Sequence, residues 1–215
     1  MNTSLLPAAR SLPNTASIFL GEVTAEEFIT GAALSTAIGL TAGTLINSTA
    51  GWLKFKDPVD GKIKLISKRP LRKAVPLTAI DSRGAVRGTA TVTIGGKLYK
   101  VRLLKGAAND PVAAGAGPTD PVQAHGSEWN RLLYLVSATP TGVSTEGIEF
   151  GKYAKFTNAD LGFGTTNGGY NWCQEAAANG YNVVRGGGNV TSFATGLPSW
   201  TEDFRGWRPV LELVN

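Results

Sequence analysis

Residues 126–136 read GSEWNRLLYLV, and their pattern organises the second half of the chain. Four apolar side chains recur in it with the i, i+3, i+4 and i+7 spacing of one helix face. They are Trp129, Leu132, Leu133 and Val136. We therefore expect an amphipathic helix over residues 127–136 that packs on a core. The glycine-rich, aromatic remainder contains two apolar segments, Tyr181 to Val184 and Trp207 to Val214, which we expect to be strands joined by long loops.

The segment before this helix, residues 106–126, is rich in Gly, Ala, Pro and Asp. This composition is typical of a linker or of a long surface loop. We place here the boundary between an N-terminal region, residues 22–105, and a C-terminal part, residues 127–215. The alternative that hairpins from residues 51–105 join the C-terminal part stays open.

The N-terminal region carries two helix signals. Thr24 and Glu27 form a capping box, so we expect a helix to start there and to end at Gly39. Residues 76–81 are expected to form a short helix with proline in its first turn. Ahead of both, residues 1–21 mix Pro, Ser, Asn and Ala without a clear period, which indicates an extended arm docked on a neighbouring subunit.

Two hairpins are expected in the same region. Residues 52–56 and 62–67 alternate polar and apolar side chains on either side of Asp-Pro-Val-Asp-Gly, which is turn chemistry. Residues 90–94 and 97–104 flank Gly95-Gly96, whose glycines supply the positive φ values of a tight primed turn. The expected fold class is therefore α+β, with N-terminal β-hairpins and short helices ahead of a C-terminal domain with long loops.

The composition excludes several kinds of site. One cysteine and one histidine in 215 residues leave no internal disulfide framework and no soft-ligand metal site within one subunit. The net charge of +5 comes from basic residues that alternate with apolar ones, as in Lys62-Ile63-Lys64-Leu65. This favours the solvated face of half-buried strands over a surface that binds nucleic acid or acidic polysaccharide. We expect no cofactor, and no membrane insertion because apolar runs fall far below roughly 18 residues.

Four segments of the second half occur in a distinctive order. They are Gly126 to Leu132 with its Glu-Trp pair, Tyr170 to Glu175, Val183 to Gly187, and Gly206 to Leu211. The order resembles the formylglycine-generating-enzyme branch of the C-type lectin fold. Members of that branch carry a helix with Glu-Trp, a Trp-Glu segment, an Arg-Gly-Gly turn and a final Gly-aromatic-Arg strand. Gly188-Asn189 departs from the Ser-Trp that the family often has, and the catalytic cysteine pair of the oxygen-using enzymes is absent.

Phage tropism determinants use the same scaffold to display binding loops. Residues 51–55, 68–72 and 96–106 also resemble segments of phage structural and tail-associated proteins. The resemblance implies a non-enzymatic structural component of a bacteriophage virion, in its tail, collar or capsid surface, with an outward-facing C-type-lectin-like domain. It implies other virion proteins as partners, a homo-oligomer, and assembly in the host cytoplasm. Two alternatives are a receptor-binding protein for host-surface carbohydrate or protein, and a cell-envelope polysaccharide hydrolase.

The motifs of this resemblance supply one set of candidate residues, and the aromatic and polar composition of the long loops supplies a second. The scaffold set consists of Trp129, Trp172, Arg185, Gly186, Gly187, Trp207 and Arg208. We expect its indoles in the core and its guanidinium groups on loop carbonyls or on carboxylates such as Glu175, with an anionic ligand as the alternative. The display set consists of Phe163, Asn167, Tyr170, Tyr181, Asn182, Phe193 and Trp200. Loop aromatics of this kind stack on sugars or pack on protein, or they cover a thin core or a subunit contact.

No catalytic residues are assigned. The only ordinary candidates are Cys173 or a serine as nucleophile with His125 as base, and we interpret Cys173 as a buried inert thiol and His125 as a solvent-facing loop histidine. The candidate acid and base pairs for glycan hydrolysis are interpreted as surface carboxylates. They are Glu146 with Glu149 and Glu202 with Asp203.

Overall fold

Two six-stranded sheets carry most of the chain in a computed structural model. It describes residues 18–108, 110, 127–138, 142–143, 148–164 and 166–214. The first sheet contains, in spatial order, β1 (Phe19–Val23), β3 (Trp52–Lys56), β4 (Ile63–Ser67), β14 (Val210–Leu213), β7 (Lys97–Arg102) and β6 (Arg87–Ile94). The second contains β12 (Phe193–Gly196), β11 (Asn182–Gly186), β10 (Tyr170–Ala176), β13 (Arg205–Trp207), β5 (Arg72–Lys73) and β2 (Thr44–Leu45).

Short helices complete the described part of the chain, which is mainly β and of broadly α+β class. They are α1 (Gly31–Ala37), α2 (Leu77–Asp81), a π-helix η1 (Asn130–Tyr134) and a 3₁₀ turn η2 (Ala178–Gly180). A further pair of strands, β8 (Gly142–Val143) and β9 (Glu149–Phe150), stands apart from the two sheets. None of the helices that the structure describes is long and apolar enough to span a membrane.

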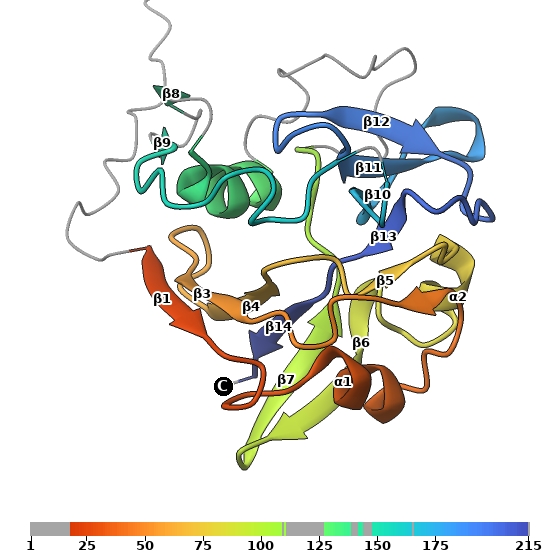
Figure 1. The fold of residues 1–215 in the computed structure, drawn as a ribbon, viewed down its shortest axis with the longest axis horizontal. Coiled ribbons are helices and arrows are strands. Elements are labelled where there is room, and N and C mark those ends of the chain that lie inside the picture. The colour runs from red at the N-terminus through yellow and green to blue at the C-terminus, as the bar shows by residue number, and fades with distance from the viewer. Residues whose placement is uncertain are drawn as a thin grey trace, which may run out of the picture.

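Both sheets combine strands from the two halves of the sequence. In the first, β14 lies between β4 and β7 (Figure 1), with Leu211 opposite Leu65 on one side and Val101 on the other. In the second, β13 lies between β10 and β5, parallel to β10 and antiparallel to β5. The C-terminal strand β14 therefore joins the two hairpins of residues 51–105 into one sheet, and β13 joins β5 to β10 in the other.

Both expected hairpins are confirmed. β3 pairs with β4 in antiparallel register from Trp52 opposite Ser67 to Lys56 opposite Ile63. β6 pairs with β7 through a tight turn at Gly95 and Gly96, whose φ values are +56° and +75°. These angles are those of a primed two-residue turn, which matches the twist of the strands it joins.

The expected helix start at Thr24 is wrong. The capping box does form, because the Glu27 amide donates to Thr24 Oγ1 at 3.2 Å and the Thr24 amide donates to the Glu27 carboxylate at 3.1 Å. It closes only an isolated turn, since the Ile29 carbonyl accepts from the Trp52 indole at 2.8 Å instead of entering a helix. The helix α1 starts at Gly31, and the expected end at Gly39 is confirmed by its φ of +68°.

Two smaller corrections concern the other N-terminal elements. Pro76 caps α2 in an extended conformation and so precedes its first turn. Residues 19–21, which we assigned to the extended arm, belong to β1 of the same chain. Phe19 pairs with Phe55 and packs on its ring at 5.3 Å between centroids, which explains why this part of the arm docks there. Residues 1–17 lie outside the described residues.

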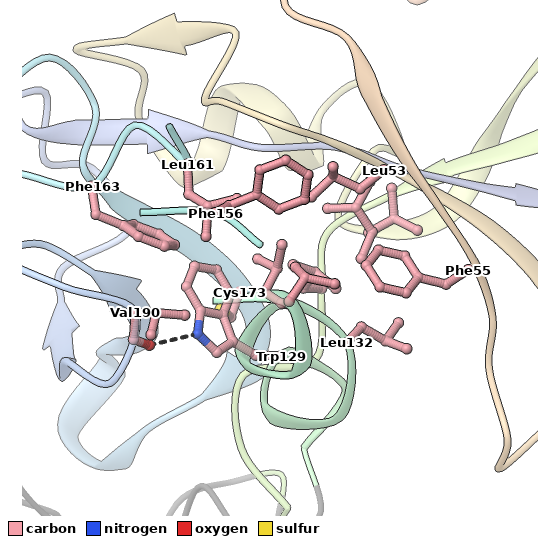
Figure 2. Close-up of a cluster of buried hydrophobic side chains, with 14 of the residues drawn as sticks. Leu53, Phe55, Trp129, Leu132, Phe156, Leu161, Phe163, Cys173 and Val190 are labelled. Atoms are coloured by element: carbon pink, nitrogen blue, oxygen red, sulfur yellow. Dashed lines mark hydrogen bonds between the residues drawn. The ribbon is translucent and has the colours of Figure 1, made fainter. Parts of the chain in front are cut away.

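The amphipathic helix is confirmed over residues 128–136, with the π-helix η1 in its middle. All four side chains of its apolar face are fully buried. They pack in one cluster with Leu53 and Phe55 of β3 and with Cys173 of β10 (Figure 2). The helix therefore joins the two sheets by covering a face of each.

A buried ionic network lies where this helix crosses the first sheet. It consists of Asp57, Lys64, Arg102, Glu128, Arg131 and Glu212. Lys64 corrects our interpretation of the basic alternation as a solvated face, because it is 1% exposed, whereas the Lys62 side chain is 41% exposed. Lys64 is buried because β4 is an interior strand and the helix covers the face that carries Lys64. Ile66 lies on the same face and belongs to the hydrophobic cluster under the helix.

Candidate functional site

A chain of buried hydrogen bonds links the four segments that carry the resemblance. Arg185 Nη2 of β11 donates to Asn130 Oδ1 of the helix at 2.9 Å. The Arg185 carbonyl accepts from Asn171 Nδ2 of β10 at 3.3 Å, and Asn171 Oδ1 accepts from Arg208 Nε at 3.2 Å. Each of these four residues is buried. The segments therefore meet around one interior polar chain.

The two scaffold arginines satisfy loop carbonyls, as expected. Arg185 Nη1 donates to the Gly106 carbonyl at 2.7 Å, and its Nε donates to that of Ser192 at 3.1 Å. Arg208 Nη1 donates to the carbonyls of Ser67 and Lys68 at 3.0 and 2.6 Å, and its Nη2 donates to that of Leu161. Burial lowers the pKa of Arg185 to about 10 and that of Arg208 to about 9. The carboxylate of Glu175 accepts from the Gly106 amide at 2.8 Å.

The three scaffold tryptophans are buried, as expected. Trp129 donates through its indole to the Val190 carbonyl at 2.9 Å (Figure 2), and Trp172 donates to the Val75 carbonyl at 2.8 Å. The Arg-Gly-Gly turn needs its glycines, because Gly187 has a φ of +80° and a Cβ there would lie 2.5 Å from the Tyr170 ring. Indoles and glycines thus shape the surface on which Tyr170 sits.

Aromatic rings surround Arg205, at the start of β13, which differs from the two scaffold arginines in its contacts. We call Arg205, Tyr170, Trp172, Trp200 and Phe204 the Arg205 cluster. The four ring centroids lie 5.7, 5.3, 4.8 and 5.0 Å from the Arg205 Cζ atom, in that order of rings. Tyr170 and Trp172 share one face of β10, and Tyr170 is directly opposite Arg205 in the parallel pair.

Arg205 is the electrostatic centre of this cluster. Its side chain is 6% exposed, and burial lowers its pKa. Its carboxylate partner is Glu202, whose side chain is 39% exposed and whose Oε2 lies 3.4 Å from the Arg205 Nε. The Nη1 atom of Arg205 is buried and has no hydrogen-bond partner. A Cβ at Gly196 would lie 2.9 Å from this nitrogen, so glycine leaves room for the guanidinium.

The display set divides between this cluster and the core. Tyr170 and Trp200 belong to the cluster, and Tyr181 packs on Trp200 edge to face at 6.0 Å. Asn182 directly follows Tyr181 and is the first residue of β11. Asn167 is exposed, and its Oδ1 accepts from Lys73 Nζ at 3.5 Å. Phe163 and Phe193 are 8% and 2% exposed in the cluster of Figure 2, so they form core and no outer surface.

Sequence reasoning missed Arg205 and Phe204. Both lie just ahead of the Gly206-Trp207-Arg208 segment, in a stretch that also contains Trp200. The usable signal was an arginine beside an aromatic residue in an aromatic loop. Its burial depends on Trp172 of β10, which is distant in sequence, so the local pattern alone does not reveal it.

The groups considered for catalysis are dispersed. Cys173 is fully buried, as expected, and burial raises the pKa of its thiol well above the usual range. Glu202 pairs with Arg205 while Asp203 pairs with Lys73 at 3.1 Å, so the two carboxylates have separate partners. His125 and Glu146 lie outside the described residues, and among those described no three His, Cys, Asp or Glu side chains could hold a metal ion together.

The Arg205 cluster offers the chemistry of a recognition surface. Half-buried rings present faces for stacking, and a guanidinium beneath them presents donors for an anionic oxygen. The scaffold arginines differ, because protein carbonyls occupy their donors.

In comparisons with known proteins, no family model, no curated protein and no solved structure matches this chain.

Proposed function

We propose that the chain is a non-enzymatic structural component of a bacteriophage virion, whose C-type-lectin-like C-terminal part faces outward and displays binding loops. The observation that carries the proposal is the buried hydrogen-bond chain from Asn130 through Arg185 and Asn171 to Arg208. It gives a shared structural task to the four segments whose order resembles that fold. Buried side chains that hydrogen-bond to one another and to backbone carbonyls in this way support a scaffold more than a reaction centre.

The position of the aromatic residues supports a display role. Trp200 and Phe204 lie between β12 and β13, and Tyr181 lies at the start of β11. Each of these side chains is half-buried, so part of its ring faces away from the core. A rigid sheet with amphipathic rings on its connecting segments is the usual design of a binding surface.

The N-terminal region supplies the attachment side in this proposal. β6 is an edge strand of the first sheet, and its residues from Arg87 to Ile94 pair on one side only, with β7. Unpaired edges are templates for contact with another chain. Residues 1–105 would then hold the protein on the capsid, collar or tail, with further copies or other virion proteins as partners.

Phage particles assembled without this chain test the proposal. We expect them to adsorb poorly to host cells or to lose infectivity faster on storage, because a surface component is missing. Supplying the intact chain in trans should restore both properties. Particles that assemble, adsorb and persist as the wild type does would contradict the proposal.

Carbohydrate recognition is the second candidate function, and the Arg205 cluster is the observation that favours it. Trp200 and Tyr181 are neighbouring half-buried rings packed edge to face at 6.0 Å, and amphipathic aromatic rings of this kind are the side chains on which sugar rings stack. On this account the outward-facing domain would contact the host through a surface glycan.

A further inference from the structure

Arg205 differs from the other buried arginines that the structure describes. Arg72, Arg185 and Arg208 each donate to several backbone carbonyls, and Arg102 is paired with two carboxylates. Arg205 alone among the described arginines has a buried nitrogen, Nη1, that lacks an acceptor. A buried donor without an acceptor costs free energy, so such a donor is unusual in a folded protein unless a bound molecule supplies the acceptor.

Glu202 compensates this charge only weakly. Its Oε2 lies 3.4 Å from Arg205 Nε, beyond the ordinary range for a charge-assisted hydrogen bond. The Glu202 side chain is 39% exposed and belongs to the turn that precedes Arg205, whose amide donates to the Glu202 carbonyl at 2.8 Å. A carboxylate in this position can swing into solvent without disturbing the sheet.

We propose that the Arg205 cluster binds a carboxylate-bearing sugar of a host-surface polysaccharide, and that Glu202 occupies the place of the ligand carboxylate when no ligand is bound. The proposal rests on the outward-facing display role proposed above. The sugar carboxylate displaces Glu202 and accepts from the Arg205 guanidinium. The sugar ring stacks on Trp200, beside Tyr181.

The surroundings of Arg205 favour a sugar over an acidic peptide or a simple anion. Of the four rings around its Cζ atom, Trp172 is buried, whereas Tyr170, Trp200 and Phe204 are half-buried, so an occupant meets aromatic surface as well as a positive charge. The apolar C–H faces of a pyranose and the carboxylate of an acidic sugar suit both. No second cation belongs to the cluster, which suits one carboxylate per sugar residue.

Calorimetric titration of the purified full chain with acidic oligosaccharides tests the proposal. The panel contains glucuronate, galacturonate and sialic acid oligomers, each beside its carboxyl-reduced counterpart. We expect an acidic member to bind, and its reduced counterpart to bind about tenfold more weakly or not at all, because a hydrogen-bonded charge pair is lost. Equal affinity for the two forms, or no binding to any acidic member, would overturn the proposal.

Three variants sharpen this test. Arg205→Lys should weaken acidic binding about tenfold, since the planar fork that fits a carboxylate is lost. Glu202→Gln should strengthen it roughly two- to fivefold, because the partly exposed carboxylate that competes for Arg205 is removed. Glu26→Gln, at an exposed residue outside the cluster, should leave it unchanged. A Glu202→Gln variant that binds more weakly than the wild type would contradict the role given to Glu202.

The outcome separates this inference from the virion role. If no oligosaccharide binds but Trp200→Ala virions adsorb poorly, a protein receptor is indicated; the sugar proposal fails and the display role stands. If the purified chain binds the acidic sugar and is absent from virions, the site assignment stands and the virion role fails. Thermal unfolding of each variant shows whether it is folded.

Discussion

Replacing Glu128 by alanine is expected to lower the free energy of unfolding by about 3–5 kcal/mol, because the buried charges of Arg102 and Lys64 each lose one of their carboxylate partners. Glu128 is 1% exposed. Its Oε1 lies 2.6 Å from Arg102 Nη2 and 2.8 Å from Lys64 Nζ, and its Oε2 accepts from the Lys105 amide at 3.0 Å. The loss of this carboxylate would leave Arg102 and Lys64 facing each other under the helix.

Denaturant unfolding at neutral pH measures this effect. Arg87→Gln is the matched control, since the Arg87 side chain is 59% exposed and pairs with Asp110 at the surface. We expect that control to cost less than about 1 kcal/mol. A Glu128→Ala variant no less stable than Arg87→Gln would show that the buried ionic network does not hold the helix on the sheet.

The pH dependence of the same effect has a definite sign. Burial alone would raise the pKa values of Asp57, Glu128 and Glu212, but hydrogen bonds and charges from lysine and arginine hold them below their usual values. A lowered folded-state pKa contributes stability above the unfolded-state pKa, and this contribution falls as the pH falls. The difference between wild type and Glu128→Ala should therefore shrink steadily below about pH 4.5.

Glu175→Gln is expected to stabilise the protein at alkaline pH by about 2–3 kcal/mol, with little change near pH 4. Burial is the main cause that raises the pKa of Glu175 from 4.5 to about 7, and Asp110 and Glu128 add to it. The folded state therefore holds the proton that the unfolded state releases, and the contribution of Glu175 to stability falls as the pH rises toward 7. Glutamine keeps an oxygen for the Gly106 amide and carries no charge.

Unfolding measured between pH 4 and pH 8.5 checks this prediction. The gap between Glu175→Gln and wild type should open between about pH 5 and pH 7 and then stay constant. Glu26→Gln, which changes an exposed carboxylate, should differ from wild type by less than about 0.5 kcal/mol throughout. A gap that is constant across the range would mean that Glu175 titrates normally in the folded protein.

Patterns among neighbouring residues correctly predicted the helices and turns that depend on those residues alone. The helix at Trp129 followed from apolar spacing, and the turn at Gly95 and Gly96 followed from the positive φ that glycine allows. The capping box at Thr24 was also local, but a contact from Trp52, far along the chain, took the carbonyl that a helix would have used. Hydrophobic periodicity indicates the secondary structure that a segment favours locally. It does not indicate which distant strand or side chain will contact that segment in the folded protein.

The candidate site was only partly predictable for the same reason. Tyr170 and Trp200 were recognised as loop aromatics, but Phe163 and Phe193 have the same sequence surroundings and lie in the core. Arg205 was missed because its burial comes from β10, which is distant in sequence. Lys64 was assigned to a solvated face because nothing near it in the sequence shows that a helix will cover β4.

A cryo-EM map of phage virions assembled with this chain tests the proposed virion role most directly. The account predicts density for the chain at the particle surface, with β6 and the N-terminal region toward the particle and Trp200 and Arg205 facing outward. Density that buries Trp200 and Arg205 against another virion protein, or a virion without the chain, would contradict it.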